Sequence, residues 1–314
     1  MHASIPPSFP PGKSPAFVSA SCAEPAYPGG LRAVARRVAW GKLFNAGQTC
    51  LAIDHVLVEA SIRDAFVAEV TAAVAALHPA PHGAASGAAS GHPRPFPDLA
   101  RVVNAATAER LRAMVRSHAA AGGAVGPPGA LERAAAAPRP DSGHADDDAR
   151  LVAPAVLSGA PTLDGPSMKS EIFGPVLPVV GVGSAAHAAR LINDRHPDPL
   201  ALYAFGRDVA ALRRDLLDRV PSGGACLNDC FSHYASPDLP FGGSGGGGGS
   251  GLGASHGRAG FDAFTHRRGV LERGAWGLEV PDGTIRYPPY ATGIGETARI
   301  ALVKFLTSTS LELP

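Results

Sequence analysis

The sequence predicts an α/β fold with a mostly parallel sheet. Two observations support it. Beyond Leu151, apolar strand-like runs alternate with amphipathic helical runs, and between residues 31 and 77 a helix, a strand and a second helix follow one another. Such alternation places helices over the faces of a parallel sheet. In the second half we expect strands at 151–157, 176–182 and 200–206, and helices at 185–193 and 209–220.

The first predicted helix covers residues 31–45. Its apolar residues recur at three- to four-residue spacing, which gives one buried face. That face comprises Leu31, Ala35, Val34, Val38, Ala39 and Phe44, whereas Arg32, Arg36, Arg37 and Lys42 lie mostly off it. Residues 1–30 are rich in proline, which interrupts helices and sheet ladders. We therefore expect an irregular segment there, with one strand at 16–18.

The next elements are a strand at 53–59 and a helix that opens at Ser61. Asp64 stands three residues after Ser61, the spacing of a capping box with Asp in place of Glu. The helix buries a stripe formed by Ile62, Phe66, Val70, Ala73, Val74 and Leu77. Another helix is expected at 105–120 with Leu111, Met114 and Val115 inward. Residues 78–97, 122–150 and 242–253 are low in complexity and predict loops.

The composition excludes several classes of protein. A net charge of +1 with 18% charged residues gives no reason to expect nucleic acid or an anionic membrane surface as a partner. The apolar run at 300–303 is far shorter than the roughly 20 residues that span a bilayer. Four cysteines in 314 residues do not form a disulfide framework, and no signal peptide is recognisable. We expect a cytoplasmic protein.

No metal site is expected. Cys226 and Cys230 lack a second cysteine or histidine pair, so plain thiols are the better interpretation. The three aspartates at 146–148 suit a solvated loop better than a metal site, and the glycine run at 245–249 lacks the strand and helix of a phosphate loop.

Cys50 is the candidate for chemistry. It follows the first helix on a turn that contains Gly47, and glycine adopts backbone angles that leave neighbouring amides free to face a negative charge. A lone cysteine is more often a small buried apolar residue. The surrounding motif favours the nucleophile interpretation.

Four blocks in order resemble the class 3 aldehyde dehydrogenases. They are RRVAWGK at 36–42 running into GQTC at 47–50, EIFGPV at 171–176, LPFGG at 239–243, and FTHRR at 264–268 with RYPP at 286–289. The resemblance runs from about Gly12 to about Tyr290. It implies an aldehyde dehydrogenase-like catalytic domain at residues 31–240 after the irregular edge at 1–30, and a glycine-rich loop with a bridging, oligomerising segment at 241–314.

The resemblance also implies an activity, namely oxidation of aldehydes to carboxylic acids with NAD or NADP through a cysteine thiohemiacetal and thioester. By position, Cys50 is the nucleophile and its amide contributes to an oxyanion hole. Glu171 is the cofactor contact at the nicotinamide ribose, with Phe173 beside it; an exposed loop carboxylate is the simpler alternative for Glu171. Residues 222–229 resemble the lining of the aldehyde tunnel, and a homodimer is expected.

Two departures from the family pattern bear on activity. Phe9-Pro10-Pro11 stands where the family's Glu-Leu-Gly carries the general base, and the family's N-terminal cofactor-binding domain has no counterpart ahead of Gly12. Three hypotheses follow: a dehydrogenase whose N-terminal part is truncated here, a catalytically inactive partner that associates with an intact relative, and a cofactor-free thiol esterase that acylates at Cys50 and turns over poorly.

Overall fold

The computed structural model describes residues 13–79, 96–136, 149–244 and 249–270, together with Thr297, Ile300, Ala301 and Lys304. The chain divides into two compact units, Met1–Thr265 and His266–Pro314. Nearly all of the described elements belong to the first unit. Several predictions fall outside the described residues, among them the Phe9-Pro10-Pro11 segment, the aspartates at 146–148, the middle of the glycine run and the RYPP block.

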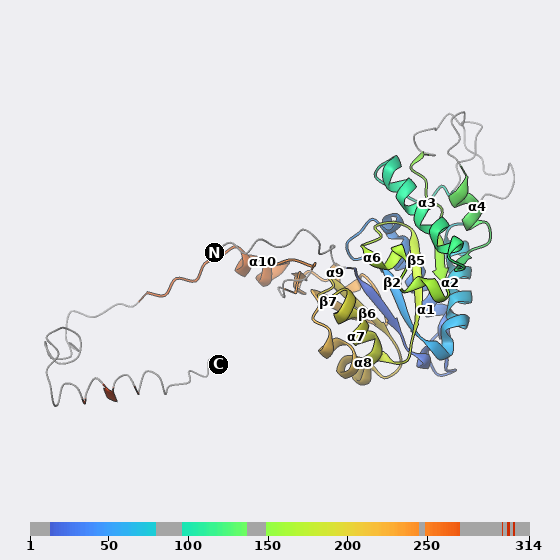
Figure 1. Cartoon of the computed structure of the whole chain (residues 1–314). Coiled ribbons are helices and arrows are strands. Elements are labelled where there is room, and N and C mark those ends of the chain that lie inside the picture. The colour runs from blue at the N-terminus through green and yellow to red at the C-terminus, as the bar shows by residue number, and fades with distance from the viewer. Residues whose placement is uncertain are drawn as a thin grey trace. The chain divides into compact units, whose positions relative to one another are not determined.

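The core of the first unit is a seven-stranded sheet in the order β3-β4-β5-β2-β1-β6-β7 (Figure 1). All neighbouring strands are parallel except β3, which runs antiparallel to β4. The strands are β1 Pro15–Val18, β2 His55–Glu59, β3 Ala124–Gly126, β4 Ala155–Ser158, β5 Val176–Val182, β6 Ala201–Phe205 and β7 Gly224–Leu227. The predicted mostly parallel α/β fold is confirmed.

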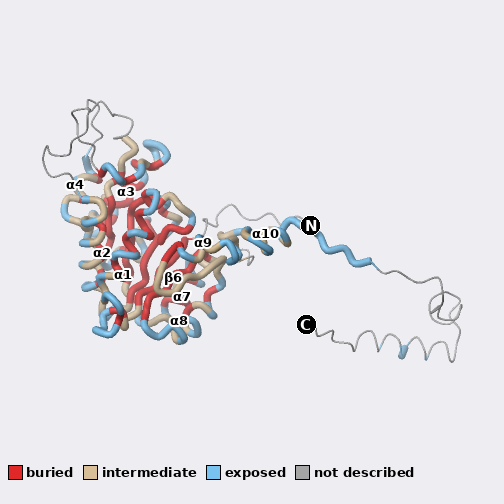
Figure 2. Tube along the Cα trace, turned by 180° about the vertical axis from the view of Figure 1, so that it is seen from behind, coloured by how far each residue is buried: buried red, intermediate tan, exposed pale blue. Residues whose placement is uncertain are grey.

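Helices cover both faces of this sheet. On one face, α1 (Gly30–Leu43) and α2 (Arg63–Leu77) pack on residues such as Val18, Val56 and Tyr203. On the other, α7 (Ala185–Arg195) and α8 (Val209–Asp215) pack on Phe17, Leu57 and Leu202. Successive strand residues point to opposite faces, so each short strand serves both layers. Figure 2 shows the strands as a buried band between these helices.

A third apolar cluster lies at the β4 end of the sheet. α3 (Ala105–Ala120) turns Leu111, Met114 and Val115 inward as predicted, and they pack with α4 (Ala130–Ala135), β4 and Ile172. The expectation of a loop across 122–150 is wrong for β3 and α4. Their sequence is dominated by alanine and glycine, which carry little periodic signal, and packing against α3 and β4 supplies the order instead.

Shorter elements connect the main ones. They are the 3-10 turns Ala20–Ala23, Phe44–Gly47, Ala60–Ile62, Ala160–Thr162 and Leu217–Arg219, the helices α6 Pro166–Lys169, α9 Ser232–Ala235 and α10 Gly257–Ala263, and the two-stranded β8 Phe241–Gly242 and β9 Ala254–Ser255. Within the described ranges, no helix is both long and apolar enough to cross a membrane.

The predicted capping box at Ser61 is wrong. Residues Ala60–Ile62 form a 3-10 turn and α2 starts directly after it at Arg63, with Ile62 at its N-cap and no side-chain cap. Asp64 instead accepts a hydrogen bond from Arg63 at 2.8 Å. The buried stripe holds, because Phe66, Val70 and Val74 face the core and Ile62, Ala73 and Leu77 pack at its margin.

Candidate active site

Three segments meet at the amino edge of the sheet. β5, β2 and β1 are adjacent and parallel, so the residues that precede them lie at the same edge. Lys13 precedes β1, Cys50 precedes β2 and Glu171 precedes β5. The sheet topology thus brings together residues that are as far as 158 positions apart in the sequence.

The cysteine turn is tightly wound. After α1 ends at Leu43, Asn45, Ala46 and Gly47 take successive positive φ angles of 49°, 54° and 75°. Such angles are uncommon for residues with a Cβ, although asparagine adopts them more readily than most. Asn45 Nδ2 donates to Gln48 O, and Gln48 Nε2 donates to Asn45 O, both at 3.2 Å. These paired bonds fix the turn ahead of Cys50.

Gly47 joins this turn to the Glu171 loop. A Cβ at position 47 would lie 2.3 Å from the backbone oxygen of Gly174. A Cβ on Gly174 would in turn lie 2.4 Å from Leu111 on α3. Two glycines are therefore required where the cysteine turn, the Glu171 loop and α3 pack together, and the predicted conformational role of Gly47 is confirmed.

Cys50 is the one exposed thiol among the four cysteines. Cys22 and Cys230 are buried, with burial raising the pKa of each to about 12, and Cys226 is half-buried. Ser14 Oγ donates to the carbonyl oxygen of Cys50 at 3.1 Å. No acceptor within the described residues engages the Cys50 amide, so that N–H is free to face an anion.

Glu171 and Phe173 lie on the facing loop. Glu171 is half-buried, and burial followed by the charge of Asp54 raises the pKa of its carboxyl to about 7. Phe173 is 40% exposed and has a positive φ of 49°. Between them, Ile172 is buried and its carbonyl accepts from Arg110 Nη2 at 2.6 Å.

A buried ion pair holds this loop in place. Lys13 Nζ pairs with Asp54 Oδ2 and also donates to the carbonyl oxygens of Ser167 and Ser170, each at 2.8 Å. Asp54 Oδ1 accepts from the Ile172 amide at 2.9 Å. Burial alone would raise the pKa of Asp54, but Lys13 and the neighbouring His55 and Lys42 outweigh it and hold that pKa far below its ordinary range.

Lys42 belongs to the same cluster, contrary to its predicted place off the buried face. It is 1% exposed, and burial lowers its pKa to about 8 although Asp54 acts in the opposite direction. Lys42 stands four residues after Val38, on the buried stripe. The sequence therefore offered one indication of this cluster, namely a charged residue, Lys42, at a position on the buried face of the helix.

An aromatic cluster adjoins the cysteine turn, in which Trp40 and Phe44 are exposed and Phe231 is buried. The rings of Trp40, Phe44 and Phe231 lie 5.0 to 5.7 Å apart. Phe44, predicted to be on the buried face of the helix, is 46% exposed because α1 ends one residue earlier. The ring therefore stands at the start of the turn that leads to Cys50.

Sequence reasoning found the two loops but missed what supports them. Cys50, Glu171 and Phe173 lie on neighbouring loops joined at Gly47. Lys13 and Ser14 belong to the segment that resembles the end of the family's Glu-Leu-Gly-Gly-Lys motif, but the sequence assigned them no role, and no local pattern marked Asp54. Across the described residues, no group of three or more histidine, cysteine, aspartate or glutamate side chains is placed to bind a metal.

Comparison with known proteins places this geometry in a family. The model of the aldehyde dehydrogenase family matches residues 11–270. Mouse aldehyde dehydrogenase family 3 member A2 is 33% identical over 93% of the chain and 51% of its own length. Human aldehyde dehydrogenase family 3 member B1 is 35% identical over 88% of the chain and 50% of its own length.

Solved structures agree with the fold. Substrate-bound Staphylococcus aureus AldH superposes with a TM-score of 0.64 at 29% identity, covering 95% of this chain and 54% of that one. An NAD-dependent aldehyde dehydrogenase from Sinorhizobium meliloti gives 0.63 at 26% identity, over 83% and 45%.

The chain belongs to the aldehyde dehydrogenase family. Its curated relatives include several family 3 members, as the sequence motifs predicted, and it spans about half the length of those it matches.

Proposed function

We propose that this chain carries the acylating cysteine and the nicotinamide-side contacts of an NAD(P)-dependent aldehyde dehydrogenase. The observation that carries the proposal is the packing of Gly47 on Gly174, which sets the turn of Cys50 against the loop of Glu171 and Phe173. Membership of the family supports the same assignment.

In this proposal, the Cys50 thiolate forms a bond to the aldehyde carbonyl carbon and the carbonyl π electrons move onto oxygen. The free amide of Cys50 donates to that oxyanion, a contact that gains strength as charge develops. Phe44, which is exposed at the start of the cysteine turn, offers a surface for an apolar or aromatic substituent on the aldehyde.

The residues present fit a nicotinamide cofactor. A half-buried carboxylate suits the hydroxyls of a ribose, and the exposed ring of Phe173 suits a flat heterocycle. Glu171 would accept hydrogen bonds from the ribose, and Phe173 would pack beside it. When bound, NAD or NADP supplies the hydride acceptor. The Lys13–Asp54 pair keeps the loop in position by holding Ser167, Ser170 and the Ile172 amide.

We also infer a homodimer in the cytoplasm. The RYPP block resembles the family's bridging segment, and the four free thiols suit a reducing compartment. Light scattering of the purified protein and fractionation of its source cells test these two inferences.

The experiment that tests the nucleophile uses p-nitrophenyl acetate. Attack by Cys50 forms an acetyl thioester and breaks the ester C–O bond, which releases one nitrophenolate. Because the family's base position holds Phe9-Pro10-Pro11, we expect a burst of about one equivalent per chain and little turnover after it. The same chain should form no NAD(P)H from an aldehyde.

Two variants decide the assignment. Cys50→Ser should abolish the burst, whereas Cys22→Ser, which removes a buried thiol in the 3-10 turn Ala20–Ala23, should retain it. A burst that survives Cys50→Ser would assign the nucleophile elsewhere, and equal loss in Cys22→Ser would show that the effect is not specific to Cys50.

A further inference from the structure

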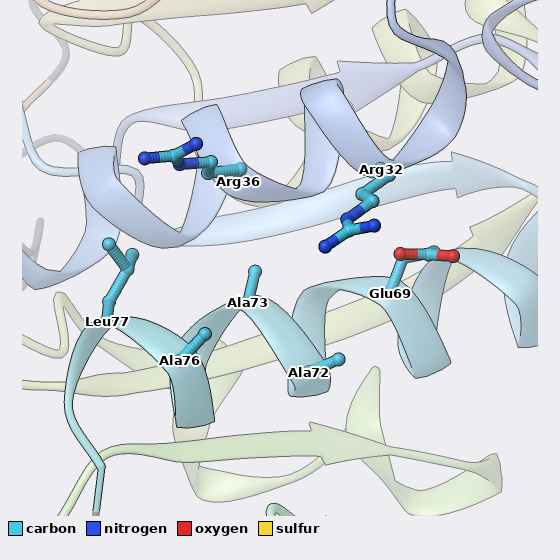
Figure 3. Close-up of a pocket in the computed structure, with 7 residues that line it drawn as sticks. All are labelled: Arg32, Arg36, Glu69, Ala72, Ala73, Ala76 and Leu77. Carbon is cyan, nitrogen blue, oxygen red and sulfur yellow. The ribbon is translucent and has the colours of Figure 1, made fainter.

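A groove between α1 and α2 lies on the face of the unit that these helices cover (Figure 3). It consists of two cavities of about 320 and 560 Å³ that share Arg32, Arg36 and Leu77 as lining residues. In Figure 3, Arg32 and Arg36 extend from α1, while Glu69 and the small apolar side chains around Ala73 and Leu77 come from α2. The volumes are in the range of small-molecule sites, roughly 300 to 1,000 Å³.

Positive charge dominates this groove. Arg32, Arg36 and Arg37 line the larger cavity without a carboxylate, and Glu69 lines only the smaller one. In the part of the chain that the structure describes, no hydrogen bond or ion pair engages the side chains of these three arginines. The formal charge of the four groups is +3 from the arginines and −1 from Glu69, which leaves +2.

The position of the arginines makes their charge harder to accommodate. Arg32 lies in the first turn of α1, which contains no acidic residue, and Arg36 and Arg37 follow about one turn later. The amino end of a helix carries partial positive charge, so cations there are unfavourable and an anion is stabilising. The partial charge of the helix end therefore adds to the charge of Arg32, and among the lining residues Glu69 alone, in the smaller cavity, carries an opposite charge.

An aromatic ring lies beside the arginines. Trp40 follows Arg36 by one helical turn, so the two share a face of α1, and Trp40 is 45% exposed and lines the larger cavity. Ala33 and Leu77 supply the remaining apolar lining. A guanidinium fork binds phosphate in two-point geometry, and an indole face stacks on flat rings.

We propose that this groove binds a phosphate monoester carried on a flat ring, of the kind found in a nucleoside monophosphate. Arg32 and Arg36 hold the dianionic phosphate, which balances the net +2 charge, and Trp40 contacts the ring. The site does not use Cys50. From Arg32 to the end of α1 the helix rises about 16 Å, so the phosphate lies well away from the cysteine turn.

Titration calorimetry on the whole chain tests this with three probes: adenosine monophosphate, adenosine and inorganic phosphate. The monophosphate should bind more tightly than either fragment, because each fragment lacks one of the two contacts. Binding should weaken as salt is raised from about 50 to about 500 mM, because salt screens the attraction between the phosphate and the arginines. Equal affinity for adenosine and its monophosphate would overturn the phosphate assignment.

Variants locate the site. Arg32→Gln and Arg36→Gln should each weaken monophosphate binding about tenfold or more, since each removes a charge-assisted hydrogen bond. Arg213→Gln, at an exposed arginine of α8 on the other face of the sheet, should leave it unchanged. Trp40→Leu should weaken monophosphate binding and spare inorganic phosphate. Equal loss in Arg213→Gln, or none in Arg32→Gln and Arg36→Gln, would contradict the proposal.

Discussion

At the scale of single residues, burial decides the chemistry around the candidate site. Lys42, Asp54 and Glu171 are charged groups gathered at the amino edge of the sheet, and their pKa values move in different directions because their partners differ. Asp54 is kept ionised by its contact with Lys13. Glu171 has no such contact, so burial away from solvent is the main influence on its pKa. A carboxyl with a pKa of about 7 changes its charge near neutrality.

Glu171 makes folding stability depend on pH. Its folded pKa of about 7 exceeds the ordinary value of 4.5, so between these values the unfolded chain releases a proton that the folded chain keeps. The folded state therefore loses stability as pH rises through that window and does not recover above it. Glu171→Gln removes this loss and should gain about 1 to 2 kcal/mol over the unmodified chain at pH 8, after allowance for solvent screening.

Urea unfolding at pH 4.5 and pH 8 measures the effect. The difference between variant and unmodified chain should appear at pH 8 and nearly vanish at pH 4.5. Glu132→Gln on α4 removes an exposed carboxylate and is the matched control. A gain of equal size at both pH values would show that ionisation of Glu171 is not its cause.

The Lys13–Asp54 pair makes a second prediction at this scale. Both side chains are at most 4% exposed, so Asp54→Asn leaves an ammonium buried without its counter-charge. We expect a loss of about 3 to 5 kcal/mol in the free energy of unfolding. The exposed pair of Arg195 and Asp164 is the control, and Asp164→Asn should cost less than about 1 kcal/mol. Similar losses for the two variants would show that burial does not govern the pair.

At the scale of elements, the contact between the cysteine turn and the Glu171 loop is made by backbone. Gly47 has a φ of 75°, and a Cβ at this position would lie 2.3 Å from the backbone oxygen of Gly174. Both observations exclude a side chain at position 47. Because the contact joins the segments ahead of β2 and β5, a change at Gly47 should alter the spacing of the two loops.

Gly47→Ala should destabilise the protein by more than about 2 kcal/mol, since left-handed strain and a backbone clash add together. Gly122→Ala is the matched control: Gly122 has a φ of 84° but no atom within 4 Å of its absent Cβ, so only the strain of about 1 kcal/mol remains. Chemical denaturation of both variants gives the comparison. Equal costs would mean that the Gly174 contact contributes nothing.

At the scale of the whole molecule, the sheet couples its two helical layers. Phe17 is 1% exposed under α7 and α8, while its neighbours Ala16 and Val18 face α1 and α2. If the helices on one face are lost, a strand that is buried on both faces is destabilised, and the helices on the other face lose their support. The first unit should therefore unfold as a single cooperative structure.

Phe17→Ala should lower the free energy of unfolding by about 3 to 5 kcal/mol. Trp40 on α1 reports the opposite layer, so its fluorescence, recorded with Trp276→Phe in the background, should shift to the same urea midpoint as far-ultraviolet circular dichroism. Val209→Ala on α8, where the side chain is 41% exposed, should change the midpoint little. Separate midpoints for the two signals would show that the layers unfold independently.

The sequence alone determined the elements with strong local signals. The periodicity of α1, α2 and α3, the apolar runs of β2, β5 and β6, and the position of Cys50 after a glycine turn all follow from residues close together in the chain. α3 and β5 were predicted with their observed bounds. In these segments local preference and tertiary packing favour the same structure, so residues close together in the chain suffice to predict it.

Tertiary structure decided the rest. The stripe position of Lys42 indicates its burial, but nothing local joins it to Lys13 and Asp54, because β1, β2 and β5 must first lie side by side to bring the three residues together. β3 and α4 form in a stretch with almost no periodic signal because α3 and β4 cover them. The exposure of Phe44 depends on where α1 ends. The physical reason is common to all three: burial and charge pairing depend on neighbours distant in sequence, and only the folded sheet supplies them.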